Sequence, residues 1–419
     1  MRRGGGPLAL ERKSAIVTLP GPNQGCQGVV RQRLDRDTRR RTVTLPLTSG
    51  VSASLPPPPQ ANLEFPLTWL LDTAPAPIQY RATNEIARLH ISDIARFAGV
   101  PYTYKPALAL AIGQDPDGTW AGGMLSIPGP RADGFQGVGT ITAVRRLLEY
   151  GWDRESPPLV QARRTLFRLL AEDDDPAFLY ELGSRGRLEI ETIRHGRTVL
   201  REAAAATLAQ AGYENDPRLR GAARRIVTRL DAFLHSPLAT KPFIRVGNHH
   251  VLAPEGAPPS VHTLLMLAHM PLFRSEHYDV MDRLFQFLAQ PQPRQVPASM
   301  VAKKIVDEPY IVLGDPLPHR TAADADVPTA LFWLELFARL QFLRRGDQWN
   351  RLYDRFLDDR DGEGVWRAPK RTATMKSTNS YVWPLFPLDT TSGEADRATD
   401  VTFRLGLIGR LSGRPITLI

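Results

Sequence analysis

The 419-residue sequence contains one cysteine, Cys26, and no long apolar run. A single thiol excludes a disulfide framework and any multi-thiolate zinc or iron–sulfur site. No stretch reaches the roughly 18–20 uncharged apolar residues that a membrane-spanning helix needs, so no transmembrane segment is predicted. The first residues, Met1–Pro7, lack the continuous apolar core of a secretory signal peptide. We therefore expect a cytoplasmic protein.

Positive charge is concentrated at the N-terminus. The formal net charge of the chain is +9, and residues 1–41 alone hold ten basic and three acidic groups. Because residues 42–60 carry no charge, only +2 remains for residues 61–419. A nearly neutral body offers no surface that follows a phosphate backbone, so no nucleic-acid binding by the folded part is predicted.

Residues 1–60 combine Gly4–Gly6, the basic run Arg31–Arg41 and the polyproline stretch Pro56–Pro59. Such a segment has too little periodic apolar surface to offset the entropy lost on ordering. We predict a disordered basic and proline-rich leader that ends in a stiff polyproline II spacer. The basic run could bind an acidic partner, or the start of translation could lie further along the chain.

From residue 61 onward the pattern is one amphipathic helix after another, with short connectors rich in Gly, Pro, Asp or Asn. β-branched alternation is nearly absent, except at Phe243–Val246 and Ile305–Leu313, which predict a small ribbon or extended loops. The helices pair into hairpins, and each hairpin needs neighbours to complete a core. These hairpins are Val138–Tyr150 with Pro158–Leu170, Thr198–Ala211 with Pro217–Leu234, Val261–His269 with His277–Leu288, and Val327–Leu343 with Trp349–Leu357. The sequence therefore predicts an all-α domain over residues 61–419, built as a stacked or closed array.

Two short loops are related to each other. Each follows a helix and places an acidic turn before Gly-x-Trp: Gln114, Gly118 and Trp120 in the first, Arg360, Gly364 and Trp366 in the second. Glycine suits the left-handed turn that ends a helix, and tryptophan can fold back over the hairpin. In the first loop Leu110 and Gln114 precede Gly-x-Trp at the spacing of the QW repeat, whereas the second has Arg360 in place of glutamine.

The first loop therefore resembles the α/α-toroid superfamily of terpenoid cyclases and protein prenyltransferases. Further stretches resemble bacterial squalene-cyclase-like proteins: residues 69–72, 78–82, 137–140, 147–152 and 381–385. The resemblance covers residues 65–415 diffusely. It implies a ring of inner and outer helices around a central apolar cavity, and an isoprenoid or other small apolar ligand within it.

A squalene-cyclase-type enzyme of that superfamily protonates an alkene with an Asp of a DxDDTA motif. The closest stretch is Asp324-Ala325-Asp326-Val327-Pro328-Thr329-Ala330, in which Val327 replaces an Asp and Pro328 is inserted. Asp326 and Asp324 are the candidate catalytic acids of a cyclase-like isomerase or lyase. The alternative is that Asp326 caps the apolar helix that follows, with Pro328 in its first turn.

The aromatic lining that such a cavity uses to stabilise carbocations could come from Phe332, Trp333, Tyr381, Trp383 and Phe386, although aromatic residues at this spacing also fit an ordinary core. No metal or cofactor is predicted. The prenyltransferase zinc site needs a cysteine, and Cys26 lies in the leader. The histidines between His249 and His277 match no ligand motif.

Two further functions stay open beside a lipid-handling protein. One is a non-catalytic helical-repeat module that binds a protein or a small ligand. The other is a carbohydrate-active α/α-barrel enzyme, for which Asp133, Asp324, Asp326 and Glu335 are the acids near the expected inner-helix starts.

Overall fold

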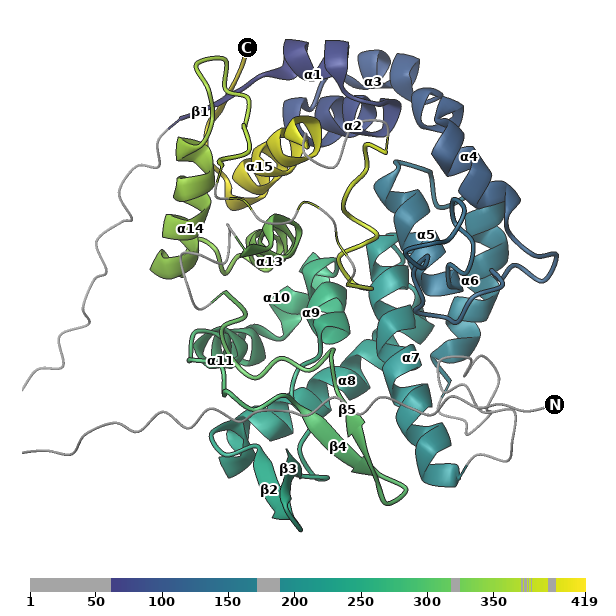
Figure 1. Cartoon of the computed structure of the whole chain (residues 1–419), viewed down its shortest axis with the longest axis vertical. Helices are drawn as coiled ribbons and strands as arrows, with labels where there is room; N and C mark the ends of the chain where they lie inside the picture. The colour runs from purple at the N-terminus through teal and green to yellow at the C-terminus, as the bar shows by residue number, and fades with distance from the viewer. Residues whose placement is uncertain are drawn as a thin grey trace, which may run out of the picture. The chain divides into compact units, whose positions relative to one another are not determined.

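The computed structural model describes residues 62–171, 189–317, 325–370, 372, 375, 377, 379–390 and 397–419. All of them belong to Pro59–Ile419, the second of the two units into which contacts divide the chain. This part is mostly helical with a few short strands, which confirms the predicted helical class (Figure 1). The leader predicted over residues 1–60 lies outside the described residues.

Several helices are buried around most of their circumference. They are α5 (Thr140–Glu149), α7 (Ile190–Gln210), α9 (Val261–Ala268), α13 (Val327–Arg339) and α15 (Ala398–Ser412). A helix shielded on all sides belongs to the interior of a protein. The alanines Ala203–Ala206 in α7 are all buried, and α7 packs extensively against α9. Their small side chains suit close helix packing.

The buried helices contact one another in chain order. Helix α5 contacts α7, α7 contacts α9, α9 contacts α13, and α13 contacts α15. Helix α15 also packs against η1 (Ala82–Ala87), a π-helical segment that continues α2 (Ala76–Arg81). Arg81, at the end of α2, then forms an ion pair with Glu149 of α5. The succession of neighbours thus returns to its starting point.

Most of the other helices bury one stripe and leave the rest to solvent. They include α1 (Leu67–Thr73), α4 (Lys105–Ile112), α6 (Pro157–Leu169), α8 (Pro217–His235), α10 (Pro271–Glu276), α11 (Tyr278–Leu288) and α14 (Asp347–Asp358). Helix α3 (Ile91–Phe97) lies between α1 and α4 in the chain. In α6 the buried Leu159, Ala162, Leu166 and Leu169 recur at helical spacing. Helix α6 packs on α5 and α7, α8 on α7, and α14 on α15.

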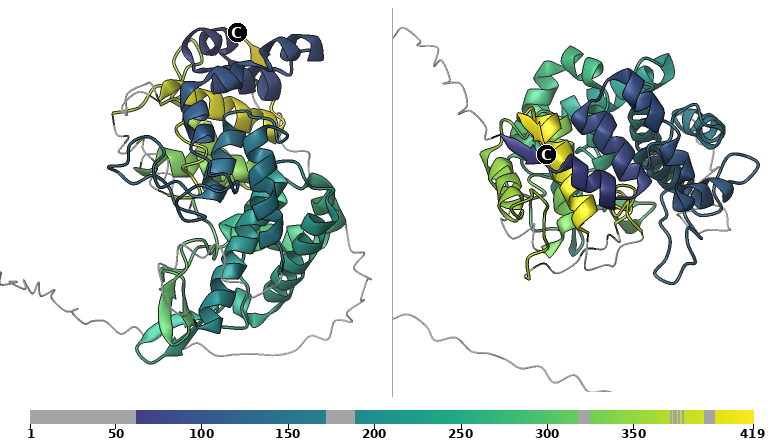
Figure 2. Two further views of the ribbon diagram at one scale, coloured as in Figure 1. Left: turned by 90° about the vertical axis from the view of Figure 1, so that its right-hand side faces the viewer. Right: turned by 90° about the horizontal axis from the view of Figure 1, so that it is seen from above.

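Three pairs of short strands complete the fold. Strands β2 (Phe243–Val246) and β3 (His249–Leu252) form one antiparallel hairpin, and β4 (Ala298–Val301) and β5 (Lys304–Asp307) form another. The segment expected to be extended up to Leu313 therefore leaves the sheet after Asp307. The unexpected pair is parallel: β1 (Leu63–Phe65) lies beside β6 (Ile416–Leu418) and joins the two ends of this unit. Both hairpins lie at the opposite end of the unit from α1 and α15 (Figure 2).

Candidate functional site

The two acidic Gly-x-Trp loops have the same backbone conformation. In each, the acidic residue donates its N–H to the carbonyl four residues on, and the glycine donates back to the acidic residue. These hydrogen bonds join Asp115 to Thr119, Gly118 to Asp115, Asp361 to Val365 and Gly364 to Asp361, at 2.8–3.0 Å. Gly118 and Gly364 have φ angles of 86° and 78°, in the left-handed region that favours glycine. The sequence similarity thus corresponds to a structural repeat.

Each loop delivers a buried tryptophan to a buried helix. Trp120 N donates to Thr140 Oγ1 at 3.1 Å, and Trp366 N donates to Thr402 Oγ1 at 3.0 Å. Thr140 begins α5, and Thr402 lies in the first half of α15. The first loop therefore connects α4 to the buried helix α5, and the second connects α14 to the buried helix α15.

Arg360 provides a link comparable to that of the glutamine it replaces. Gln114 Nε2 donates to Pro158 O at 2.8 Å, which ties the first loop to the start of α6. Arg360 Nη1 donates to Glu64 O at 2.8 Å, which ties the second loop to β1. In both cases a long side chain with N–H donors bridges from a helix end to a backbone carbonyl elsewhere, so the departure from the repeat preserves the connection.

Charged side chains meet between the buried helices. Arg404 of α15 donates to Glu149 of α5 and to Glu335 of α13, each at 2.7 Å. Arg81 also pairs with Glu149, and Arg339 pairs with Glu335 at 2.8 Å. The side chains of Glu149, Glu335 and Arg404 are at most 5% exposed. We call these five residues the central ion cluster.

The arginines keep both glutamates ionised. Burial alone would raise the pKa of Glu149, but Arg81 and Arg404 outweigh it and hold this pKa well below its usual range. Arg404 and Arg339 likewise lower the pKa of Glu335. An ionised carboxylate cannot donate a proton. Glu335, an acid considered for a carbohydrate-active enzyme, is therefore not placed to act as a general acid at neutral pH.

The space beside the central ion cluster is nearly filled. A cavity of about 10 Å³ remains there, lined by Glu149, Glu335, His269, Phe332 and other side chains. This is close to the volume that one water molecule needs. Charged, polar and aromatic side chains together line this small cavity.

Asp326 is the N-cap of α13. Its Oδ1 accepts a hydrogen bond from Thr329 N at 3.0 Å, its Oδ2 accepts one from Thr329 Oγ1 at 2.8 Å, and its side chain is exposed. This geometry matches the capping alternative. Asp324 lies outside the described residues.

Replacement of Asp326 by alanine is expected to lower the free energy of unfolding by about 1 kcal/mol, because α13 loses its cap. Asp326→Asn should stay close to the wild type, because asparagine caps equally well. Urea denaturation followed by circular dichroism measures both. Equal losses in the two variants would contradict a capping role.

The predicted aromatic lining divides between two places. Phe332, Trp333 and Tyr381 form one cluster, with ring centroids 5.1–6.4 Å apart. Phe386 is buried in the core. Trp383 lies elsewhere, against Phe135, and lines the pocket described next.

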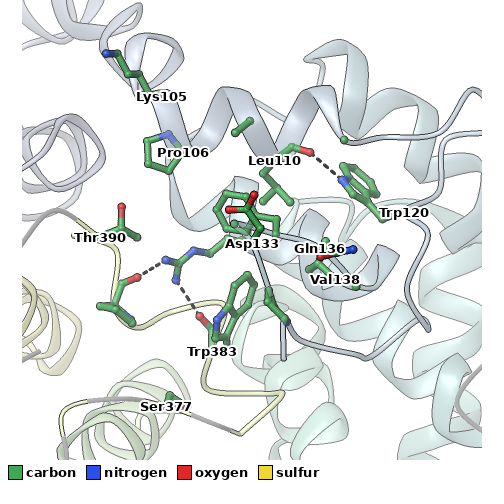
Figure 3. Close-up of a pocket in the computed structure, with 18 of the residues that line it drawn as sticks. Lys105, Pro106, Leu110, Trp120, Asp133, Gln136, Val138, Ser377, Trp383 and Thr390 are labelled. Carbon is green, nitrogen blue, oxygen red and sulfur yellow. Dashed lines mark hydrogen bonds between the residues drawn. The ribbon is translucent and has the colours of Figure 1, made fainter. Parts of the chain in front are cut away.

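A pocket of about 850 Å³ opens between α4, the loop that leads into α5, and the segment around Trp383 (Figure 3). Its volume falls within the range of small-molecule sites. Most of its wall is apolar or aromatic: Pro106, Leu110, Trp120, Phe135, Val138 and Trp383. We call it the α4–α5 pocket.

Arg146 brings a positive charge to the wall of this pocket. Its Nη1 donates to Trp383 O at 2.8 Å, its Nη2 donates to Pro387 O, and the residue is 2% exposed. The guanidinium carbon lies 4.9 Å from the centroid of the Trp383 ring. Its Nε has no hydrogen-bond partner among the described residues. A buried donor without a partner is costly, and an acceptor on a ligand would satisfy it.

Two more cations and one acid line the same pocket. Lys105 and Arg397 carry the additional positive charges, and Asp133 is the acid. Lys105 begins α4 and is exposed, whereas Arg397 is buried and donates to Asp389 O at 2.6 Å. With Arg146, the described part of the wall holds three cations against one carboxylate. Its charge therefore favours an anionic ligand.

The segment that carries Trp383 is held in place by a buried acid. Asp400 of α15 accepts hydrogen bonds from Leu388 N at 2.7 Å and from Asp389 N at 3.0 Å. Burial raises the pKa of Asp400 to about 6, although these hydrogen bonds and the nearby Arg404 act in the opposite direction. Arg146 and Asp400 thus fix this wall of the pocket from two buried helices.

Most of the charged residues that define these sites were not predicted. Arg145, Arg146 and Glu149 fall within one arc of about 100° on α5, because each residue advances about 100° around a helix. Such a stripe usually faces solvent, and here it faces inward. Only the partners on α13 and α15 distinguish the two cases.

The described residues contain no group of three or more His, Cys, Asp or Glu side chains that could hold a metal ion. His262 and His269, placed on one helix face by their spacing, lie in α9 and at its C-terminal cap. Each described helix is too short or too polar to traverse a bilayer.

Comparison with protein-family models finds no match to this chain, and comparisons with curated proteins and with solved structures find none either.

Proposed function

We propose that residues 61–419 form an α/α-toroid that binds an amphipathic anion in the α4–α5 pocket. The ligand would have a phosphate or carboxylate group and an apolar body such as an isoprenoid chain. The buried, incompletely hydrogen-bonded Arg146 on an otherwise largely apolar wall carries this proposal.

The toroid is supported by the order of helix contacts. The buried helices follow one another as neighbours, and the ion pair of Arg404 with Glu149 links α15, the last member, to α5, the first. The outer helices α6, α8 and α14 each pack on a buried helix. The parallel pair of β1 and β6 joins the N-terminal and C-terminal ends of the array. A closed array lets every hairpin bury its remaining apolar face.

The α4–α5 pocket favours an amphipathic anion for two reasons. The apolar wall around Leu110, Trp120 and Val138 gives an apolar body a surface to bury. Arg146 and Lys105 provide positive charge, and hydrogen bonds from charged donors are stronger than neutral ones. The ligand would thus bind beside α5, in the α4–α5 pocket.

Binding is the proposed activity. Cyclisation started by protonation needs a carboxylic acid that is shielded from water and faces the ligand. Asp326 is exposed and caps α13. Ligand binding needs no such acid, so the α4–α5 pocket is sufficient for the proposed activity.

Titration calorimetry of the full chain with farnesyl phosphate and with farnesol tests the proposal. The phosphate should bind at least about tenfold more tightly, because a hydrogen bond to a charged group contributes about 1.5–3 kcal/mol. Dodecyl phosphate and dodecanol form a second pair with a straight alkyl chain. Comparing the two phosphates shows whether the pocket prefers an isoprenoid chain or accepts any apolar chain. Equal affinities for phosphate and alcohol would contradict an anion site.

Variants then locate the site. Arg146→Met and Lys105→Met should each weaken phosphate binding about tenfold and leave the alcohol unaffected. Arg146 also holds the segment around Trp383, so the exposed Lys105 provides the variant with the smaller risk to folding. The matched control is Lys241→Met, which removes the same charge from an exposed position that does not line the pocket. If Lys241→Met weakens binding as much as Lys105→Met, the effect is not local.

A further inference from the structure

A second large cavity lies at the hairpin end of the unit, well away from the α4–α5 pocket. Its volume is about 1010 Å³, and it is enclosed by α7, α8, the start of α9 and the two β-hairpins. Its lining includes the apolar Ile226, Leu230 and Val251. It also includes several polar groups from α7, α9 and the residues after β5. We call it the hairpin cavity.

Glu202 of α7 is the first polar group of this cavity. Its Oε2 accepts hydrogen bonds from Ser260 Oγ at 2.5 Å and from Thr263 Oγ1 at 3.2 Å. Its Oε1 lies 3.7 Å from Arg229 Nη2, whose side chain is 44% exposed. The hydroxyl groups fix the orientation of the carboxylate. Arg229 and Arg201 are the arginines whose charges act on Glu202.

Glu308, which follows β5, is the second polar group of the hairpin cavity. Its side chain is 8% exposed, and its Oε1 lies 3.3 Å from His195 Nε2. Burial raises the pKa of Glu308, the charge of Glu202 raises it further, and His195 opposes both. Burial also raises the pKa of Glu202. Two buried carboxylates that disfavour each other's charge would both be stabilised by a cation placed between them.

His262 provides an independent observation. It is 3% exposed, lies on the cavity wall and packs its ring 4.7 Å from the ring of Tyr310. Its Nε2 has no hydrogen-bond partner in the described part of the chain. Burial and the nearby Arg145 lower the pKa of His262 to about 3, so the imidazole is neutral. A neutral imidazole can offer Nε2 as an acceptor to a donor on a ligand.

The charges on the wall have a negative balance. Among the described residues it carries four carboxylates, Glu191, Glu202, Glu255 and Glu308, against the two arginines Arg194 and Arg229. Acceptors therefore predominate, and the aromatic face of Tyr310 adds a surface that attracts cations.

We propose that the hairpin cavity binds an alkylammonium group, with the ammonium between Glu202, Glu308 and His262 and the alkyl chain along Ile226, Leu230 and Val251. The ammonium supplies three N–H donors to a wall rich in acceptors. Its chain buries apolar surface against these three residues. A free diamine and a lysine side chain share this chemistry.

Titration calorimetry of the full chain with 1,6-diaminohexane and with 1,6-hexanediol tests the site. The diamine should bind at least about tenfold more tightly than the diol, which has the same chain without charge. Nα-acetyl-lysine amide tests the other source of the ammonium, and binding of either amine supports the proposal. Failure of both amines to bind, or equal binding of diamine and diol, overturns it.

Glu202→Gln and Glu308→Gln should each weaken amine binding about tenfold or more. Glutamine has the shape of glutamate, and circular dichroism shows whether each variant is folded. The matched control is Glu276→Gln, which removes the same charge from the exposed Arg220–Glu276 pair and should not change amine binding. Arg146→Met should also leave amine binding unchanged. A failure of anion binding in the α4–α5 pocket can thus be distinguished from a failure of amine binding in the hairpin cavity. Unaltered amine affinity in both folded glutamine variants would overturn the assignment.

Discussion

Glu149→Gln is expected to lower the free energy of unfolding by about 3–5 kcal/mol, the usual cost of breaking a buried ion pair. The substitution keeps the size of the side chain but removes its charge. Arg81 and Arg404 would then share the central ion cluster with one carboxylate fewer, and both are almost fully buried. Since a domain is typically stable by about 5–15 kcal/mol, the loss is large. The midpoint of urea denaturation measures it.

The matched control is again Glu276→Gln. Because the Glu276 side chain is exposed to solvent, its ion pair with Arg220 contributes little, and the urea midpoint should stay close to that of the wild type. Similar shifts in the two variants would contradict a special role for the central ion cluster.

The cost of Glu149→Gln should also depend on pH. The folded-state pKa of Glu149 lies below its unfolded value, which is about 4.3 for a glutamate. The stability that this carboxylate contributes is therefore present above about pH 4.3 and is lost as the pH falls through the folded-state pKa. The difference between the wild type and Glu149→Gln should be constant near neutral pH and shrink on acidification below about pH 4. A difference that does not change with pH would show that charge is not the cause.

Gly139→Ala is expected to destabilise the protein by about 3 kcal/mol or more, because a side chain at this position meets backbone. A Cβ on Gly139 would lie 1.6 Å from Gly123 O and 2.7 Å from the carbonyl carbon of Met124. The same close approach allows Gly139 N to donate to Ser126 O at 2.9 Å and Ile141 N to donate to Met124 O at 3.0 Å. The loop would have to leave the start of α5, and these hydrogen bonds would be lost.

The substitution should affect ligand binding as well, because this loop forms part of the wall of the α4–α5 pocket. Thermal unfolding and farnesyl phosphate titration of the same sample measure both effects. Gly99→Ala is the matched control: nothing lies within 4 Å of the added Cβ, so stability should change by less than about 1 kcal/mol. If Gly139→Ala changes stability and ligand binding as little as Gly99→Ala does, this would contradict the close packing of the loop on α5.

Short-range interactions made much of this protein predictable from its sequence. Apolar residues at helical spacing indicate the helices, and the caps follow from single side chains such as Asp326, whose partner is three residues away. The Gly-x-Trp loops are of the same kind, because Gly118 and Gly364 are required by turns that close within four residues. For these features the interacting groups are near neighbours in the chain.

The unpredicted features depend on partners far apart in the chain. β1 and β6 are three residues each, too short to be recognised alone, and their register joins Leu63 to Ile416. Glu149 and Arg404 are separated by 255 positions. The polar stripe of α5 has the same spacing whether it faces water or other charges, so the sequence could not distinguish a solvent-facing helix from a buried one.

The sequence by itself thus determined the helical class, the packing of α5 with α6 and of α7 with α8, and the two repeated loops, because each depends on groups that are near neighbours in the chain. Only the tertiary structure decided which charged groups meet between the buried helices and where the pockets lie. Arg146 shows why: its position in α5 follows from the helix, but its burial, its hydrogen bonds to Trp383 and Pro387, and its unpartnered Nε depend on a segment more than two hundred residues away. The free energy of a buried charge is set by its surroundings, and those surroundings exist only once the distant segments have packed together.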